Sequence, residues 1–257
     1  LGGDGHDLLD GGLGIDEILG GPGNDLIFGG EDDDELQGNE GDDWLEGGPG
    51  GDILVGDVGA PTGQVPLYAG NDVLIGGPLG DKMTGFSGDD IMLGEGGFDK
   101  FNGLLGFDWG SFESAAHGVT ADMRLRQFVP NSVAAAGDAV RDFWVETEAV
   151  SGSRFADVLL GTNAALPDPF NELANVTLIK GLAAYFPAGP VAFSGGNLML
   201  GGGGSDLLQG NGGNDILDGD AALHVALLPN AQGAIGPGSP ILREIRADQA
   251  AGPTFDP

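Results

Sequence analysis

The sequence contains no cysteine and little positive charge. Lysine and arginine together number 9 against 40 aspartates and glutamates, so the 257-residue chain has a formal net charge of −31. A charge of that sign repels nucleic acid and anionic membrane surfaces, and the absence of cysteine excludes disulfides and thiolate metal sites. No apolar run approaches the roughly 20 residues of a membrane span. These absences predict a cationic partner, no nucleic acid and no membrane span.

The usual signatures of catalysis are also missing. The sequence has no HExxH zinc motif and no GxSxG nucleophile motif, and its histidines, His6, His117 and His224, lie far apart. We therefore expect no enzymatic activity in this chain. The chain starts at Leu1 inside a repeat and without a signal peptide, which predicts that it is part of a longer protein. A catalytic domain elsewhere in that parent protein is compatible with this interpretation.

A nine-residue repeat fills much of the chain. Residues 2–28, GGDGHDLLDGGLGIDEILGGPGNDLIF, hold three units with glycine at positions one, two and four, aspartate at position six and an aliphatic residue at position eight. A fixed period of this kind indicates a solenoid. Asp72 follows Asp52 at more than twice the usual spacing, which predicts a loop inserted in one unit near residues 57–68. Position six gives the candidate metal ligands Asp7, Asp16, Asp25, Asp34, Asp43, Asp52, Asp72, Asp81, Asp90, Asp99, Asp108, Asp157, Asn197, Asp206 and Asp215.

The spacing of the acids predicts what they bind. The glycine-rich half of each unit predicts a tight turn, and the other half predicts a short strand that points its aliphatic residue inward. Two units then form one coil, so Asp7 lies over Asp25 at a strand spacing of about 4.7 Å. Carboxylates stacked so closely repel each other, and Ca²⁺ between them reverses the sign of that interaction. We expect several Ca²⁺ ions, with further oxygen ligands from turn carbonyls such as those of Gly3, Gly5, Gly12, Gly14, Gly21 and Gly23.

The units GGDGHDLLD, GGLGIDEIL, GGPGNDLIF and GGGGSDLLQ resemble the RTX (haemolysin-type) calcium-binding nonapeptide GGxGxDxUx, where U is aliphatic. The resemblance implies an all-β fold, a right-handed parallel β-roll or β-solenoid, export through a dedicated one-step channel and folding outside the cell. Other units depart from the pattern: Asp32 and Leu79 replace the fourth glycine, and Gly110 takes the apolar position after Asp108. The segments FDWGSF and SGSRFADVLLG resemble sequences beside RTX repeats in very large secreted bacterial proteins, some of which carry an animal-type haem peroxidase domain.

The pattern divides the chain into five parts. We expect the β-roll over residues 1–110, wider solenoid coils over 111–160, an insertion over 161–193, a second repeat group over 194–220, and a C-terminal extension over 221–257 that continues into further sequence. Within the insertion, apolar residues at helical spacing predict one short helix over 171–186 that covers a flank of the roll. Trp44 stands beside the inward Leu45, so we expect it to face outward as a contact surface.

Three functions are compatible with this sequence. The first is a non-catalytic calcium-binding module that folds on export and stabilises a larger secreted protein, with the other domains of the parent chain as partners. The second is a structural subunit that self-assembles into a calcium-dependent extracellular filament, surface layer or matrix. The third is an accessory region of a secreted haem peroxidase-like enzyme. Each of them places the protein outside the cell or at the cell surface.

Overall fold

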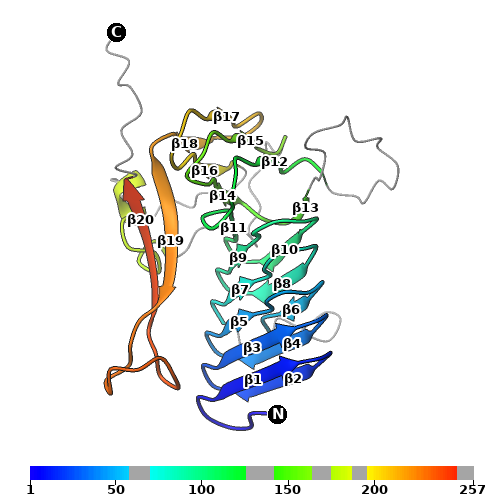
Figure 1. Ribbon diagram of the computed structural model, residues 1–257. Helices are drawn as coiled ribbons and strands as arrows, with labels where there is room; N and C mark the ends of the chain where they lie inside the picture. Colours follow the sequence, from blue (N-terminus) through cyan, green and yellow to red (C-terminus); the bar gives the residue numbers. More distant parts are fainter. Residues whose placement is uncertain (58–69, 126–141, 164–174, 187–195, 248–257) are drawn as a thin grey trace.

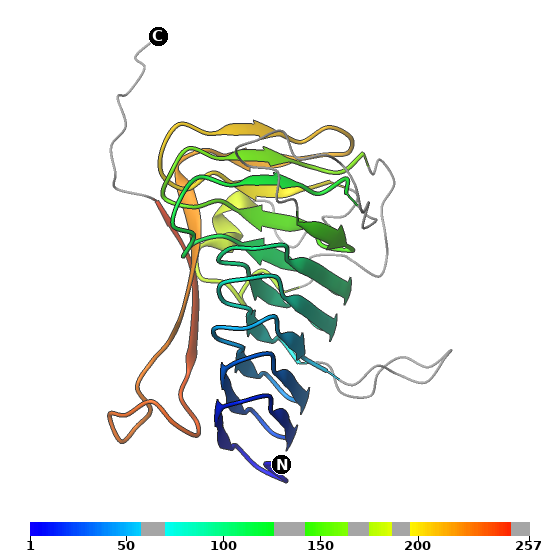
Figure 2. The ribbon, with the colours of Figure 1, turned by 45° about the vertical axis from the view of Figure 1, so that its right-hand side comes forward.

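The structure, a computed structural model, describes residues 1–57, 70–125, 142–163, 175–186 and 196–247. Short parallel strands stack along one axis, coil above coil, and a long hairpin runs beside the stack (Figure 1). Figure 2 shows the first coils at one end of the stack and the coil after residue 200 at the other end. The prediction of an all-β parallel β-roll is confirmed. Over the ranges given above, no helix has the length and apolar character needed to cross a membrane.

The parallel strands of the described residues form three sheets. Sheet 1 contains β1 (Leu8–Leu13), β3 (Leu26–Glu31), β5 (Trp44–Glu46), β7 (Val73–Ile75), β9 (Ile91–Leu93), β11 (Trp109–Ser111), β14 (Ala149–Ser151), β16 (Leu198–Leu200) and β18 (Ile216–Asp218). Sheet 2 contains β2 (Glu17–Pro22), β4 (Glu35–Glu40), β6 (Ile53–Val55), β8 (Lys82–Ser87), β10 (Lys100–Leu105) and β13 (Phe143–Val145). Sheet 3 contains β12 (Thr120–Asp122), β15 (Val158–Leu160) and β17 (Leu207–Gln209), and β19 (Ala221–Leu227) pairs with β20 (Ile241–Ala247) in an antiparallel hairpin.

The strand register follows the predicted coil of two units. Leu9 of β1 pairs with Ile27 of β3, which lies one full coil further along the chain. Across the predicted insertion, Leu45 of β5 pairs with Leu74 of β7, so this coil spans 29 positions instead of the usual 18. The register therefore shows that this coil holds extra residues, while the loop predicted near residues 57–68 stays a prediction because residues 58–69 lie outside the described residues.

The aliphatic residues at position eight form the inner core of the roll. Ile27, Leu36 and Leu45 are fully buried, and the row continues upward through Met83 and Phe101. Period-two alternation in each strand leaves the residues on both sides of the inward one pointing outward. The inner core therefore fixes the register of every coil.

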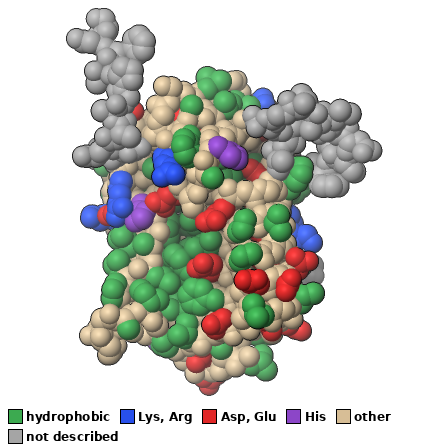
Figure 3. Space-filling view, in the orientation of Figure 1, with side chains coloured by type: hydrophobic (Ala, Val, Ile, Leu, Met, Phe, Trp, Pro, Cys, Tyr) green, Lys and Arg blue, Asp and Glu red, His purple; other side chains and the backbone are tan. Residues whose placement is uncertain are grey.

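The outward side chains of sheet 1 form a second, outer core. Leu26, Trp44 and Ile91 are buried there, together with Leu223 and Val225 of the hairpin. On sheet 2, by contrast, the outward side chains include Glu17, Glu35 and Lys82, which are exposed. The hairpin therefore covers the apolar face of the roll and leaves the polar face in water. Figure 3 shows hydrophobic side chains gathered where the hairpin lies against the roll, with acidic side chains beside them.

The expectation that Trp44 forms an exposed contact surface is wrong. Trp44 does point away from the inner core, but only 6% of it is exposed, because β19 and β20 cover sheet 1. The hairpin is fastened by polar contacts to the wider coils: Leu223 N donates to Ser151 Oγ at 3.0 Å, and Val225 N donates to Glu113 Oε2 at 3.2 Å. The predicted C-terminal extension thus supplies the cover of the outer core.

The predicted helix over residues 171–186 is wrong where the structure describes it. Residues 175–186 form turns and a single 3₁₀ turn, Leu182–Tyr185, while residues 171–174 lie outside the described ranges. Lys180 bonds to β20 as an extended residue, since its N donates to Arg243 O and its O accepts from Ile245 N. Gly181 follows with a φ of 95°, which ends any right-handed helix. The segment still covers the roll, because Ile179 and Leu182 are buried in the outer core.

Gly110 takes the inward position of β11 for a steric reason. The ring of Trp144 fills the inner core at this level and stacks on Phe101 with the ring centroids 4.4 Å apart. A methyl group placed on Gly110 would lie 2.4 Å from the Trp144 ring. The departure from the repeat at Gly110 therefore makes room for an aromatic side chain from the coil above.

This packing predicts the effect of adding one methyl group. Gly110→Ala should lower the free energy of unfolding by about 1–3 kcal/mol, because the added methyl group would overlap the buried Trp144 ring. Gly96→Ala is the matched control, since no atom lies within 4 Å of the added methyl, and it should change stability by less than about 0.5 kcal/mol. Urea unfolding at saturating calcium measures both. Equal effects of the two substitutions would contradict this packing.

Candidate metal sites

The residues at position six form ladders along the edges of the sheets. In each step the backbone N of one residue donates to a side-chain oxygen of the residue one coil above, as from Asp7 to Asp25 at 2.8 Å and from Asp25 to Asp43 at 2.7 Å. Ladder 1, at the start of the sheet 1 strands, contains Asp7, Asp25, Asp43, Asp72, Asp90, Asp108 and Glu148. Ladder 2, at the start of the sheet 2 strands, contains Asp16, Asp34, Asp52, Asp81, Asp99 and Asp142.

Ladder 3 is short and joins Asp157 to Asp206. Asp157 N donates to Asp206 Oδ1 at 2.9 Å, in front of β15 and β17. Near it, Asn197 N donates to Asp215 Oδ1 at 2.8 Å, in front of β16 and β18. The structure thus places the sequence-predicted acids in vertical pairs, one coil apart.

Two ladder members, Asp142 and Glu148, were missed by the repeat pattern. Each stands directly before a strand with a buried central residue, Trp144 in β13 and Val150 in β14. The glycine turn of the nonapeptide is absent in front of both residues in the sequence. The signal that finds them is the acid placed two residues before an inward apolar side chain.

Most ladder aspartates have one carboxylate oxygen without a hydrogen-bond partner in the described part of the chain. Oδ2 is buried and finds no hydrogen-bond partner among the described residues at Asp7, Asp16, Asp25, Asp34, Asp43, Asp52, Asp72, Asp81, Asp90 and Asp108. At all of them except Asp7 and Asp16, which begin the two ladders, Oδ1 accepts the ladder hydrogen bond. Buried polar atoms in proteins are almost always paired. A column of unpaired anionic oxygens therefore indicates a ligand.

Asp157 and Asn197 differ from these residues. Asp157 Oδ2 accepts from Ser153 N at 2.7 Å, and Asn197 Oδ1 accepts from Thr162 N at 2.8 Å. The Asn197 amide also donates to Glu148 O at 3.3 Å. The side-chain oxygens of both residues are thus already hydrogen-bonded within the chain.

The first glycine of each unit leaves space for the unpaired oxygen. A methyl group placed on Gly2 would lie 2.6 Å from Asp7 Oδ2 and 2.5 Å from Gly20 O of the next coil, and one on Gly20 would lie 2.2 Å from Asp25 Oδ2. The carboxylate oxygen and the carbonyl oxygen of the coil above thus border one small space. The sequence did not single out the first-glycine carbonyls.

The carbonyls that the sequence did single out face the coil above. Methyl groups placed on Gly21 and Gly23 would lie 2.2 Å from Gly3 O and 1.9 Å from Gly5 O. Side chains are therefore sterically excluded at these points, which brings successive turns into close backbone contact. The carbonyl of Gly12 faces Gly30 in the same way, at 2.1 Å.

Burial makes the ladder carboxyls weak acids. It raises the pKa of Asp43 and Asp99 to about 8 and that of Asp81 to about 7. For the fully buried Asp72 and Asp90, burial first and the next carboxylate of the ladder second hold the pKa well above its usual value. The folded ladder is therefore stabilised by whatever positive charge it binds, proton or metal.

A second set of hydrogen bonds runs beside ladder 1 through the residues at position five. Asn71 N donates to Asp42 Oδ1 at 2.8 Å, and Asp89 N donates to Asn71 Oδ1 at 3.0 Å. Arg243 of β20 reaches this edge, where its guanidinium donates to Asn71 O. Burial lowers the pKa of Arg243, and the carboxylate of Asp42 opposes that shift. The hairpin thus places a fixed positive charge next to the acid column.

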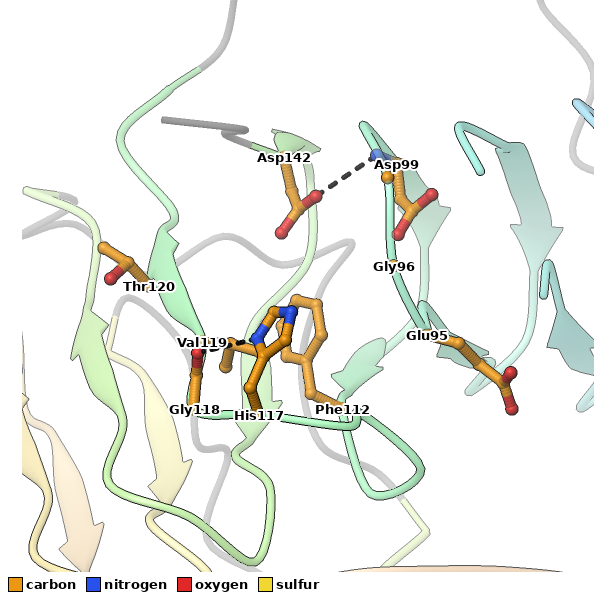
Figure 4. A pocket seen from close by; sticks show the side chains of 10 residues that line it. Glu95, Gly96, Asp99, Phe112, His117, Gly118, Val119, Thr120 and Asp142 are labelled. Atoms are coloured by element: carbon orange, nitrogen blue, oxygen red, sulfur yellow. Dashed lines mark hydrogen bonds between the residues drawn. The ribbon is translucent and has the colours of Figure 1, made fainter. Parts of the chain in front are cut away.

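Ladder 2 ends at a cavity of about 230 Å³ (Figure 4). Asp99, Asp142, Phe112 and His117 contribute to its lining, and Asp99 N donates to Asp142 Oδ1 at 3.1 Å. Figure 4 shows the two carboxylates near this hydrogen bond, with the His117 ring across the cavity. The last two carboxylates of ladder 2 therefore lie against open space.

The donor set fits calcium. Within the described ranges, no three side chains of His, Asp or Glu converge on one point, so a metal held by the ladders takes carboxylates from neighbouring coils together with backbone carbonyls. Hard oxygen donors in flexible, mixed arrangements are what Ca²⁺ prefers.

Comparison with known protein families finds the RTX calcium-binding nonapeptide repeat in four places, at residues 1–36, 28–62, 68–101 and 191–222. The chain carries RTX repeats. RTX repeats bind calcium, so the chain is a calcium-binding repeat module. The matched ranges include the ladder residues from Asp7 to Asp99, whereas the ladder residues Asp108, Asp142 and Glu148 fall outside them. Comparison with curated proteins and with solved structures gave no match.

The raised carboxyl pKa values predict how this RTX chain responds to pH without calcium. The folded chain binds protons more tightly than the unfolded chain, whose aspartates titrate near about 3.9. The resulting stability is complete below about pH 4 and is lost as pH rises through about 8, the value for Asp43. In chelator, far-ultraviolet circular dichroism should show more sheet at pH 5 than at pH 8.5.

The control is the calcium-saturated protein, in which we expect the ladder carboxylates to be ionised. Its sheet signal should stay constant between pH 6 and pH 8.5. A chelator-treated sample with as much sheet at pH 8.5 as at pH 5 would contradict the assignment of buried, weakly acidic ladders.

Proposed function

We propose that this chain is the calcium-dependent folding module of a larger secreted protein. The observation that carries the proposal is the column of buried Oδ2 atoms that lack a partner in the described part of the chain, as at Asp25, Asp43 and Asp72. Leaving a buried charged oxygen unpaired is strongly unfavourable. When these carboxyls are ionised, the roll is therefore stable only with cations in the spaces beside these oxygens.

Two opposing terms explain why calcium controls folding. Successive carboxylates stand about one strand spacing apart, roughly 4.7 Å, in a chain of net charge −31 that must also order 52 glycines. Bound calcium supplies the positive charge that offsets this repulsion. Asp Oδ2 and the first-glycine carbonyl of the coil above are the groups that hold it, as at Asp7 with Gly20. Asp157 and Asn197 are weaker ligands, because their oxygens already accept hydrogen bonds.

This balance suits a protein that is exported before it folds. Extracellular calcium modules bind with dissociation constants of about 10⁻⁴–10⁻³ M, far above the calcium concentration inside cells. The chain therefore stays largely unfolded during synthesis and folds after it reaches calcium outside the cell. Each coil contacts only its neighbours, so the folded roll adds stability coil by coil to the protein that contains it.

The module acts through structure and not through catalysis. RTX repeats are generally structural, and the repeated, equivalent carboxylates form no pair with distinct acid and base environments of the kind that hydrolases use. We assign any chemical activity of the parent protein to other domains.

An exchange of one ladder oxygen tests the proposal. In Asp25→Asn, Oδ1 still accepts from Asp7 N, but the charge and the second anionic oxygen are lost. The calcium concentration at half-folding should rise by at least about threefold, which corresponds to about 0.65 kcal/mol. In chelator the variant should be no less folded than the wild type, because it also removes repulsion.

Asp10→Asn is the matched control, since Asp10 is exposed on β1 outside the ladder. Its calcium midpoint should equal that of the wild type. Equal calcium midpoints for Asp25→Asn and Asp10→Asn would refute the proposed function. A wild-type sheet signal that is the same with and without chelator at pH 8.5 would also refute it.

Assembly of copies is a second candidate function. The end of β1 and the turn after it expose two apolar side chains, Leu13 at 81% and Ile15 at 79%. Light scattering after calcium addition separates the two roles. Ordered polymers that disappear in Leu13→Ser would favour assembly, and a monomer would exclude it.

A further inference from the structure

The ladder step between Asp108 and Glu148 lies outside the RTX repeats, yet it repeats their oxygen geometry. We propose that Asp108, Glu148 and the carbonyl of Glu146 form an additional calcium site, at a turn that contains no glycine. The inference rests on the proposed function, because it takes calcium as the ion that the ladders bind.

Glu148 occupies the aspartate position of its coil. Trp109 of β11 pairs with Ala149 of β14, so the residues before them, Asp108 and Glu148, lie one above the other. Asp108 N donates to Glu148 Oε2 at 3.0 Å, the same bond that joins Asp25 to Asp43 lower in the ladder. The two acids lie 40 positions apart in the chain, more than twice the usual coil. The longer coil therefore still places a carboxylate in the ladder.

Asp108 presents the unpaired oxygen that marks the other steps. The residue is fully buried, its Oδ1 accepts from Asp90 N at 2.9 Å, and its Oδ2 has no partner within the described ranges. A methyl group placed on Gly103 would lie 2.1 Å from Asp108 Oδ2 and 2.3 Å from Glu146 O. These two oxygens therefore border the same small space that Asp25 Oδ2 shares with a glycine carbonyl in the repeats.

The turn between β13 and β14 achieves this geometry without glycine. Only Glu146 and Thr147 separate Val145 from Glu148, where a nonapeptide unit inserts its whole glycine turn. Glu146 adopts a φ of 46°, in the left-handed region that the repeats assign to glycine, and Thr147 Oγ1 donates to Val145 O at 3.2 Å. The turn is thus held in a conformation that aims the Glu146 carbonyl at Asp108.

The donors select the class of ion. Two carboxylates and a carbonyl are hard oxygen ligands, which favour calcium over zinc or copper. The Glu146 side chain is exposed and contributes only its backbone carbonyl to the site. Glu146 and Glu148 therefore offer a matched pair of substitutions in one turn.

Calcium stoichiometry of the full chain tests the inference, with equilibrium dialysis or native mass spectrometry at saturating calcium as the measurement. Glu148→Gln keeps an oxygen for the Asp108 N–H but removes the charge, and it should bind one ion fewer than the wild type. Glu146→Gln should bind the wild-type number. Circular dichroism checks that both variants are folded.

A second variant blocks the space without changing charge. Gly103→Ala puts a methyl group between Asp108 Oδ2 and Glu146 O, and it should also lose one ion, whereas Gly96→Ala should lose none. Wild-type counts in both Glu148→Gln and Gly103→Ala would overturn the inference while leaving the RTX sites intact. A wild-type chain that binds no calcium would instead refute the proposed function itself.

Discussion

One constraint governs the whole structure: the apolar packing that fixes the strand register also stacks carboxylates in columns, where they repel one another. The inward residue stands two places after the acid in every unit, so burying Ile27 over Leu45 also sets Asp25 over Asp43. The strands cannot slip by one residue to separate the charges, because that would turn the inner core outward. Hydrogen bonds from the backbone use one oxygen of most of these carboxylates and leave the other without a partner in the described part of the chain. Hydrophobic burial therefore holds the acids in register, and under the proposed function cation binding determines whether that register is stable.

The same alternation explains why the roll needs its hairpin on one side only. Outward positions on sheet 1 hold Leu26, Val73 and Ile91, and the hairpin covers them. Because this cover must also lie against an acidic edge, it brings its own positive charge: buried Arg243 donates to Asn71 O between the coils of Asp42 and Asp89. The hairpin thus buries the apolar face of sheet 1 and also offsets part of the negative charge at its edge.

The sequence predicted the features that the nine-residue period controls. Its predictions failed where segments far apart in the chain contact each other. The phase of the repeat was enough to find the ladder acids from Asp7 to Asp99 and to expect extra residues before Asp72. It could not identify Glu148, because a short turn replaces the glycines there, and it could not bury Trp44, because the covering strands come from the far end of the chain. The predicted helix failed because Lys180 bonds to β20. The outward positions, compared at the period of one full coil, would have shown that alternate units are apolar outside and so require a cover.

The first and fourth glycines of a unit are needed for different physical reasons. This difference decides whether a unit that departs from the consensus keeps the space for its ligand. The fourth position needs a left-handed backbone, and other residues adopt it at a cost, as Asp32 does with a φ of 79° and Leu79 with a φ of 96°. The first position needs empty space, because its missing side chain makes room for the carboxylate oxygen. In the unit of Leu79 that space is kept, since a methyl group on Gly76 would lie 2.3 Å from Asp81 Oδ2. Loss of the fourth glycine therefore strains a turn but spares the site, whereas loss of the first glycine would fill the site itself. Under the proposed function, we therefore expect the capacity of such a chain for calcium to follow its first glycines and its ladder acids, and not its agreement with the full consensus.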